Sequence, residues 1–455
     1  MNISHKLEKL MHPDLINGSI IKSLIAFLIP LLISYTFQQC YSAADAVIVG
    51  HYLHEESLAA IGAAAVLFEL LIGFGMGFGN GLGIVVARAF GANREDILKK
   101  CVSAAFVITV IITLLIMIAG KFFLMPLLNI LGTPKEIILE SYSYINTIAV
   151  FCGVLFAYNL FSALLRAIGN SFMPLIFLII SSLLNISLDI IFITKFGMGV
   201  KGTAIATVIA QGISALLCFI YIFTKAKILI PSKIHFKPEV LIYRDMLGQG
   251  LSMAFMGSIV TSGTVIIQSA INSFGKFIIA GHIAARKIFT MTTIPIFTLG
   301  MTASTFASQN YGAGKYDRIR KGVKDAILII TGWTILLILV FPFVLKFLMI
   351  FISGSQNPEV LNYGVKYVQF MLPFYIALGG VIVIRNALQG LGSKLLPLIS
   401  SIIEMLGKIL FTIVIIPKMG TRGIIICEPL IWCAMCIQLV YTYLRNPAIS
   451  RKNKS

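Results

Sequence analysis

Five carboxylates stand inside long apolar stretches of this chain, where a negative charge is expensive. They are Asp45, Glu69, Asp189, Glu404 and Glu428. A carboxylate at the centre of a lipid bilayer costs about 3 kcal/mol or more unless it is paired or faces water. Each of them therefore needs a partner or a function.

Three of these acids are interpreted from their neighbours in sequence. Glu404 has Lys408 one helical turn later, which predicts an ion pair within one helix. Glu428 follows the segment "GTRG" (420–423) by five residues, and we expect it at the outer membrane interface. Glu69 has no local partner, so a bond to a neighbouring helix and another role both stay open.

Asp189 has polar side chains at matching depth. Asn185 lies four residues earlier, on the same helical face. Asp189 precedes Lys195 by six residues, and Thr207 follows Lys201 by six residues on the next apolar stretch. If the two stretches are antiparallel helices, the carboxylate, amide and hydroxyl groups can meet.

Asp45 lies 23 residues after Lys22, which is about 34 Å along a helix and places it in the same outer half of a membrane. Two desolvated carboxylates repel each other, which raises the proton affinity of at least one of them. Oxygen ligands of this kind also suit Na⁺. A static hydrogen-bonded cluster is the alternative. We predict a cation site, for H⁺ or Na⁺, at Asp45, Asn185, Asp189 and Thr207, and no other cofactor.

The composition indicates the setting of these acids. Of the 455 residues, 58% are hydrophobic and 12% are charged, and the mean hydropathy is +0.95. Soluble domains contain about 25% charged residues, so the chain is predicted to be an integral membrane protein. The net charge of +18 does not indicate nucleic acid, because the basic residues lie between apolar stretches and are not interleaved with aromatic ones.

Twelve stretches are long enough to cross a bilayer, which takes about 20 apolar residues. Lysines and arginines are unevenly divided between the two sides of the predicted membrane: the loops on the side of the N-terminus, with both termini, hold 24, and the opposite loops hold 9. This asymmetry predicts that both termini are cytoplasmic. The predicted spans are 20–49, 57–87, 101–120, 138–163, 172–194, 202–224, 246–272, 278–307, 326–351, 361–384, 396–416 and 423–444.

The two halves of the chain resemble each other. "FGANREDILKK" (90–100) matches "YGAGKYDRIRK" (311–321), and "LRAIGNSFMPL" (165–175) matches "LQGLGSKLLPL" (388–398). Six spans separate the copies, so both halves have the same orientation. The predicted fold is an all-α polytopic membrane protein of two six-helix bundles related by a parallel internal repeat.

The predicted domains follow from this repeat. They are an N-terminal bundle (1–224), a cytoplasmic linker (225–245) and a C-terminal bundle (246–455). Repeats of this kind enclose a substrate path between the halves. Acids are missing from the positions of the second half that correspond to Asp45 and Asp189, so the cation site belongs to the first half.

Other residues have weaker patterns. Gln268 and Asn272 are candidates for lining a cavity, whereas His282 and Arg286 lie near the outer end of their span, where an interface position is at least as favoured. In "GFGMGFGNGLG" (73–83), glycines fall on two helical faces, which predicts close helix packing.

The chain resembles the multidrug and toxic compound extrusion (MATE) family over its whole length. The motifs that carry the resemblance are "IPLLISYTFQQCYSAADAVIVG" (29–50), "FGANREDILKK" (90–100), "LRAIGNSFMPLI" (165–176), "NISLDIIFI" (185–193) and "ASQNYGAGKYDRIRKG" (307–322). The resemblance implies two six-helix bundles around a central cleft, which export cationic amphipathic drugs in exchange for H⁺ or Na⁺. It is strongest to the DNA-damage-inducible (DinF-like) branch and its bacterial relatives.

The resemblance also implies residue roles. The coupling-ion site of that branch corresponds to Asp45, Asn185, Asp189 and Thr207, a first-helix proline suspected of bending corresponds to Pro30, and a fourth-helix asparagine to Asn159. The acids that the NorM-like branch carries in its seventh and tenth helices are missing here, since Gln268 and Asn272 are neutral.

We therefore expect a multidrug efflux antiporter of the bacterial inner membrane, acting as a monomer on small organic cations and conferring antibiotic resistance. If Na⁺ is the coupling ion, Asp45 and Asp189 would bind it as a metal. The alternatives are a lipid-linked precursor flippase of the same superfamily and a membrane-embedded enzyme. The enzyme is disfavoured because no catalytic acid cluster is found, and the flippase because the unpaired intramembrane charges are mostly acidic.

Overall fold

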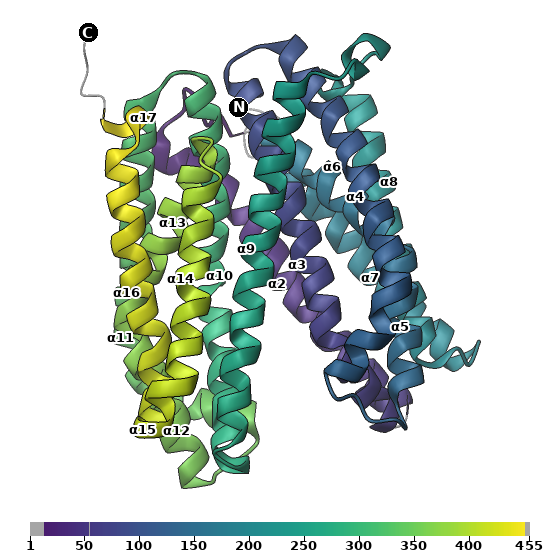
Figure 1. Cartoon of the computed structure of the whole chain (residues 1–455), viewed down its shortest axis with the longest axis vertical. Helices are drawn as coiled ribbons and strands as arrows, with labels where there is room; N and C mark the ends of the chain where they lie inside the picture. Colours follow the sequence, from purple (N-terminus) through teal and green to yellow (C-terminus); the bar gives the residue numbers. More distant parts are fainter. Residues whose placement is uncertain (1–12, 54, 451–455) are drawn as a thin grey trace, which may run out of the picture. The chain divides into compact units, whose positions relative to one another are not determined.

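The computed structural model describes residues 13–53 and 55–450, and their regular secondary structure is entirely helical (Figure 1). The first half contains α2 (Ile20–Tyr52), α3 (Glu55–Gly91), α4 (Glu95–Ile130), α5 (Ile138–Val150), α6 (Cys152–Ala167), α7 (Phe172–Thr194) and α8 (Gly199–Lys225). Two short 3-10 helices, η1 (Lys227–Leu229) and η2 (Lys233–Phe236), lead to α9 (Val240–Asn272).

The second half continues with a further series of long and short helices. They are α10 (Lys276–Gly312), α11 (Tyr316–Ser353), α12 (Pro358–Met371), η3 (Leu372–Phe374), α13 (Tyr375–Gly390), α14 (Leu395–Leu410), η4 (Phe411–Ile415), α15 (Ile416–Met419), α16 (Thr421–Arg445) and α17 (Pro447–Ser450). Three predicted spans are interrupted helices: α5 with α6, α12 with α13, and α14 with α15. The first of these bends by 49° at its break.

Ten helices of the described residues are long and apolar enough to cross a membrane, and the bent pair α5 and α6 makes up to eleven. The eighth predicted span, α10, is not among these helices. Its six threonines, with Arg286 and Lys287, lower its hydropathy. The helices extend beyond the predicted spans: α4 has 36 residues and α11 has 38. At 1.5 Å per residue each exceeds the roughly 30 Å hydrocarbon core, so the basic motifs predicted as loops form helix ends instead.

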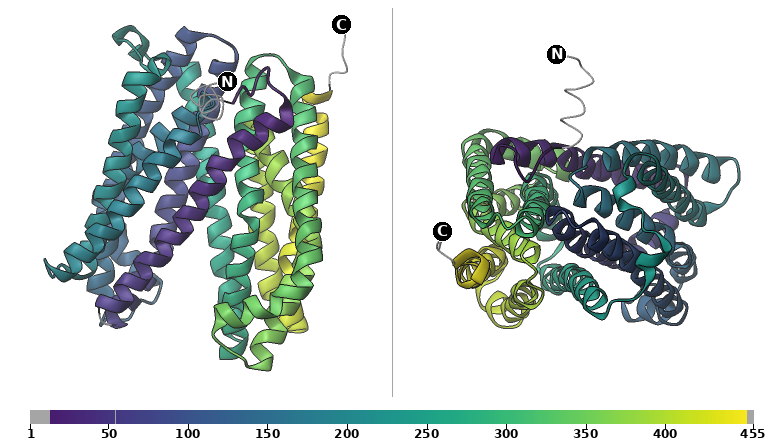
Figure 2. Two further views of the ribbon diagram at one scale, coloured as in Figure 1. Left: turned by 180° about the vertical axis from the view of Figure 1, so that it is seen from behind. Right: turned by 90° about the horizontal axis from the view of Figure 1, so that it is seen from above.

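The chain packs as two compact units. One contains residues 29–257, and the other contains residues 15–28 and 258–450. The long helices of each unit run beside one another, as the end-on view in Figure 2 shows. These packing units differ from the predicted halves at α2 and α9, each of which contributes to both. The domain boundaries drawn from the repeat stay a prediction.

Glycines of α3 allow close packing inside the first unit. A Cβ atom on Gly81 would lie 2.5 Å from the Gln249 carbonyl oxygen of α9, and one on Gly77 would lie 2.6 Å from the Met253 oxygen. On the other face, a Cβ on Gly79 would lie 3.0 Å from the backbone of Asn159 in α6. The two predicted glycine faces therefore pack against two different helices.

The segment between α8 and α9 is ordered and packs on α4. The Ser103 hydroxyl donates to the His235 carbonyl at 2.6 Å, and Lys100 pairs with Glu239 at 2.8 Å. The predicted linker (225–245) is therefore part of the first packing unit, and its last residues already form the beginning of α9.

Candidate functional site

The predicted cation site draws its four residues from three helices of the first unit. Asp45 lies on α2, Asn185 and Asp189 on α7, and Thr207 on α8. The α7 and α8 helices form the antiparallel pair that the sequence predicts. Their connection contains Gly197 at φ 60° and Gly199 at φ 56°, a backbone conformation that glycine adopts without a steric penalty.

Asn185 is the centre of the cluster and is 2% exposed. In the amide orientation that satisfies both of its neighbours, its nitrogen donates to Asp45 Oδ1 at 3.2 Å. In the same orientation its oxygen accepts from the Thr207 backbone N–H at 3.3 Å. Asn185 thus joins α2 to α8, and it supplies a donor to a carboxylate that is only partly buried.

Asp189 is in a different situation. Its side chain is 1% exposed, and neither carboxylate oxygen accepts a hydrogen bond from any described residue. The nearby acid is Asp45, whose carboxylate lies within interaction range. A buried carboxylate without donors and beside a second acid is compensated when a proton or a metal cation binds. The arrangement is therefore suited to taking up a cation.

Thr207 takes part differently from what the sequence predicts. Its hydroxyl donates to the Thr203 carbonyl of its own helix at 3.0 Å, and its backbone N–H contacts Asn185. The hydroxyl oxygen keeps lone pairs, but its proton is bonded to the Thr203 carbonyl. Of the predicted meeting of three groups, only the contact between Asn185 and Thr207 is found, through the Thr207 peptide and not its hydroxyl.

Two tyrosines near the acids were missed by the sequence analysis. Tyr41 on α2 and Tyr144 on α5 both interact electrostatically with Asp45 and Asp189. Tyr41 precedes Asp45 by four residues, so helical spacing gave a usable signal. Tyr144 is 8% exposed and 45 residues before Asp189 in the chain, and no local pattern connects the two.

The remaining predicted residues lie in other surroundings. Asn159 in α6 is buried and donates to the Leu155 carbonyl of its own helix at 2.9 Å. Pro30 lies inside α2, where its carbonyl accepts from the Ser34 hydroxyl at 2.8 Å. Gln268 and Asn272 belong to the second unit, where Gln268 donates to Asn272 at 2.9 Å.

One of the predictions for the acids of the second unit is confirmed. Lys408 Nζ lies 2.8 Å from Glu404 Oε1, so the predicted ion pair is present. Glu428, which we expect at the outer membrane interface, has a buried side chain that pairs with Arg286 at 2.7 Å, and its depth in a membrane stays a prediction. His282 is also buried, bonded to the hydroxyl of Tyr363 at 3.0 Å.

Glu69 remains without a partner. It is exposed in α3 and makes no hydrogen bond or ion pair with another described residue. A bond to a neighbouring helix, which was one of the two interpretations left open, is therefore not found in the described part of the chain.

These observations define a class of protein: a multi-pass, all-α membrane protein with an internal repeat and a buried pair of acids in its first unit. The family model described as MatE matches the chain twice, at residues 30–191 and 252–414. Since the matches cover most of the chain, it belongs to the MatE family, as the motifs predicted. The two matches start 222 residues apart, which confirms the parallel repeat.

Relatives of known sequence agree with this assignment. The probable multidrug resistance protein YoeA of Bacillus subtilis is 27% identical over 93% of both chains. The multidrug export protein MepA of Staphylococcus aureus is 24% identical over 94% of both chains.

Solved structures show the same fold. A crystal structure of MATE in the bent conformation has a TM-score of 0.88 at 21% identity and covers 96% of this chain and 97% of that one. An outward-facing multidrug resistance MATE transporter has a TM-score of 0.87 at 21% identity and covers 96% of this chain and 98% of that one. The predicted fold class is thereby confirmed.

Proposed function

We propose that this protein exports amphipathic organic cations across the bacterial cell membrane, in exchange for H⁺ or Na⁺ entering at the Asp45 and Asp189 site. Membership of the MatE family supports the transport of drugs, since relatives carry the names of multidrug resistance and export proteins. The ion coupling is supported by one observation above all. Asp189 is almost fully buried beside a second acid and accepts no hydrogen bond in the described chain.

Exchange follows if ion and drug compete for the same negative field. A cation bound at the acids neutralises their charge, so the site then favours release of a cationic drug. The drug is preferred when the acids are free. A ligand shifts the equilibrium between two transporter states only by its difference in affinity for them, and here that difference arises from the charge of two carboxylates.

The test is ethidium accumulation in inverted membrane vesicles containing the full-length protein. The vesicle interior is loaded with acid in one arm and with Na⁺ in the other. We expect accumulation with at least one of the two gradients, and we expect Asp45→Asn and Asp189→Asn to reduce it at least tenfold, towards the level of vesicles without the protein. Asparagine keeps the shape of the side chain but cannot carry the negative charge.

The control is Asp317→Asn, the same chemical change at an exposed acid that pairs with Arg320 on α11 of the other unit. It should transport like the parent protein. Full transport by both Asp45→Asn and Asp189→Asn would contradict the proposed coupling site. Absence of transport with either ion in the parent protein would instead favour the lipid-linked precursor flippase.

A further inference from the structure

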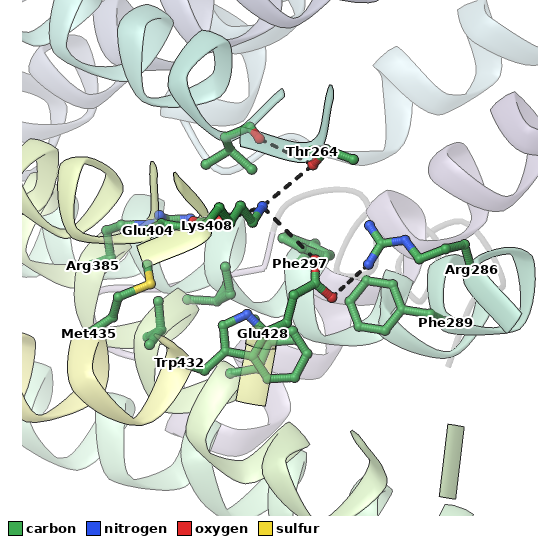
Figure 3. A pocket seen from close by; sticks show the side chains of 14 residues that line it. Thr264, Arg286, Phe289, Phe297, Arg385, Glu404, Lys408, Glu428, Trp432 and Met435 are labelled. Carbon is green, nitrogen blue, oxygen red and sulfur yellow. Dashed lines mark hydrogen bonds and ion pairs between the residues drawn. The ribbon is translucent and has the colours of Figure 1, made fainter. Parts of the chain in front are cut away.

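A second cluster of charged residues lines a pocket inside the second unit (Figure 3). Its charged members come from four helices: Arg286 from α10, Arg385 from α13, Glu404 and Lys408 from α14, and Glu428 from α16. The rest of the lining is mostly aromatic and aliphatic, including Phe289, Phe297 and Trp432.

Four of the charges compensate one another. Lys408 Nζ lies 2.8 Å from Glu404 Oε1 and 3.9 Å from Glu428 Oε1, and it donates to Thr264 Oγ1 at 3.5 Å. The other oxygen of Glu428 accepts from Arg286 at 2.7 Å and from the Tyr367 hydroxyl at 3.3 Å. Both acids of the pocket are therefore held by a cation.

Arg385 is the remaining cation of the pocket, and it forms no ion pair with a described carboxylate. Its side chain is 9% exposed, it donates to the Ser401 hydroxyl at 3.4 Å, and its Nε has no partner among the described residues. Although Glu404 attracts it electrostatically, that carboxylate is already bonded to Lys408. The pocket holds three cations and two anions, so it has one positive charge in excess. An uncompensated buried charge is strongly destabilising.

The size of the cavity limits what can compensate this charge. Its volume is about 90 Å³, whereas a single water needs roughly 10–15 Å³ and drug-sized pockets measure about 300–1,000 Å³. Several waters, an inorganic anion or the charged end of an organic ligand fit, but a whole drug does not. The single excess charge matches a monovalent group.

We propose that this pocket binds a monovalent anion, with Arg385 as its main contact. The anion is either a free inorganic ion or the carboxylate of an organic ligand whose apolar part contacts the aromatic lining. Guanidinium groups bind carboxylates through charge-assisted hydrogen bonds, which are about twice as strong as neutral ones. The pocket lies in the unit that lacks the paired acids, so this binding does not depend on the proposed ion coupling.

The experiment uses the purified full-length protein in lipid nanodiscs at constant K⁺ concentration. Potassium benzoate or potassium chloride replaces the potassium salt of a bulky buffer, and binding is followed by calorimetry and by thermal unfolding. We expect benzoate to bind and to raise the unfolding temperature, and uncharged benzyl alcohol not to do so. Arg385→Gln should weaken the binding by at least about tenfold, the loss of one hydrogen bond to a charged group.

The control is Arg445→Gln, at an exposed arginine that stacks on Tyr441 of α16. It should bind benzoate like the parent protein. If chloride binds as well as benzoate, the ligand is a free anion; if only benzoate binds, it is the carboxylate of an organic ligand. Both results support the proposal.

Three results would overturn it. They are no binding of either anion by the parent protein, equal binding by Arg385→Gln, and binding of benzyl alcohol as tight as that of benzoate. A fourth measurement addresses folding. Because Arg385→Gln removes an uncompensated charge, its unfolding temperature without added anion should equal or exceed that of the parent protein. A clearly lower value would mean that Arg385 is already compensated, which also contradicts the proposal.

Discussion

Asp45 and Asp189 are held by different neighbours, although both belong to the candidate cation site. Asp45 accepts a hydrogen bond from the Asn185 amide, whereas Asp189 accepts none from the described residues. Asn185 therefore supports the charged form of one acid and leaves the other to be compensated by a bound ion. It is a positioning residue for Asp45, and its effect should differ from that of removing an acid.

We expect Asn185→Ala to raise the apparent affinity for H⁺ by about tenfold or more, because it removes a hydrogen bond to the charged form of Asp45 that contributes about 1.5–3 kcal/mol. The measurement is the ion concentration that gives half-maximal ethidium transport. Asn129→Ala is the matched control, since the Asn129 amide is exposed and donates to the Met125 carbonyl of its own helix. An unchanged ion affinity in Asn185→Ala would show that the amide does not act on the site.

Among the ion pairs of the second unit, sequence predicted the local one and missed the one between distant residues. Glu404 and Lys408 are one helical turn apart, so their ion pair follows from spacing alone. Glu428 and Arg286 are 142 residues apart, and only the packing of α10 against its neighbours brings them together. The ion pair of Glu428 with Arg286 was consequently not predicted.

At the scale of helices, the glycines of α3 show what a pattern can predict. Their spacing gave the two faces, but it contains no information on which helix would cover each. The structure assigns α9 to the face of Gly77 and Gly81, and α6 to the face of Gly79 and Gly83. A contact of a glycine with the backbone of another helix leaves no side-chain signal in that other helix.

We expect Gly81→Ala to destabilise the protein by about 1–3 kcal/mol, because the added Cβ would lie 2.5 Å from the Gln249 oxygen and the two backbones would have to separate. The measurement is thermal unfolding in detergent. The control is Gly62→Ala in the same helix, where a Cβ meets nothing within 4 Å. That change should be neutral or stabilising, and equal destabilisation by both variants would contradict the packing argument.

For the whole molecule, composition and repeat sufficed for the fold class, and hydropathy alone did not. The α10 helix was predicted as a span from the length of its apolar stretch, although its threonines and charges reduce its apolar character. Several helices extend beyond the predicted spans at both ends, because segments with basic residues were interpreted as loops. Hydropathy measures where a helix leaves the bilayer, and a helix can continue into water.

The orientation of the chain is predicted by its lysines and arginines. With 24 of them in the loops on the side of the N-terminus and 9 on the other side, both termini should be cytoplasmic. A green fluorescent protein fused to either terminus should fluoresce, and alkaline phosphatase at either terminus should be inactive. Phosphatase activity at one terminus would mean an odd number of spans and would contradict the twelve-helix interpretation.

The sharing of α2 and α9 between the packing units has a consequence for cutting the chain. A cut in the segment 225–245 would separate the first repeat from residues 246–257, whose Gly250 lies against the Phe78 ring of α3. It would also leave the second repeat without residues 15–28, although the Leu15 carbonyl accepts from Asn310 at 3.0 Å. The N-terminal fragment would keep residues 15–28, which pack in the second unit, and the C-terminal fragment would keep residues 246–257, which pack in the first. We therefore expect neither half to fold stably without the other, because each would lack a segment that packs in its own unit.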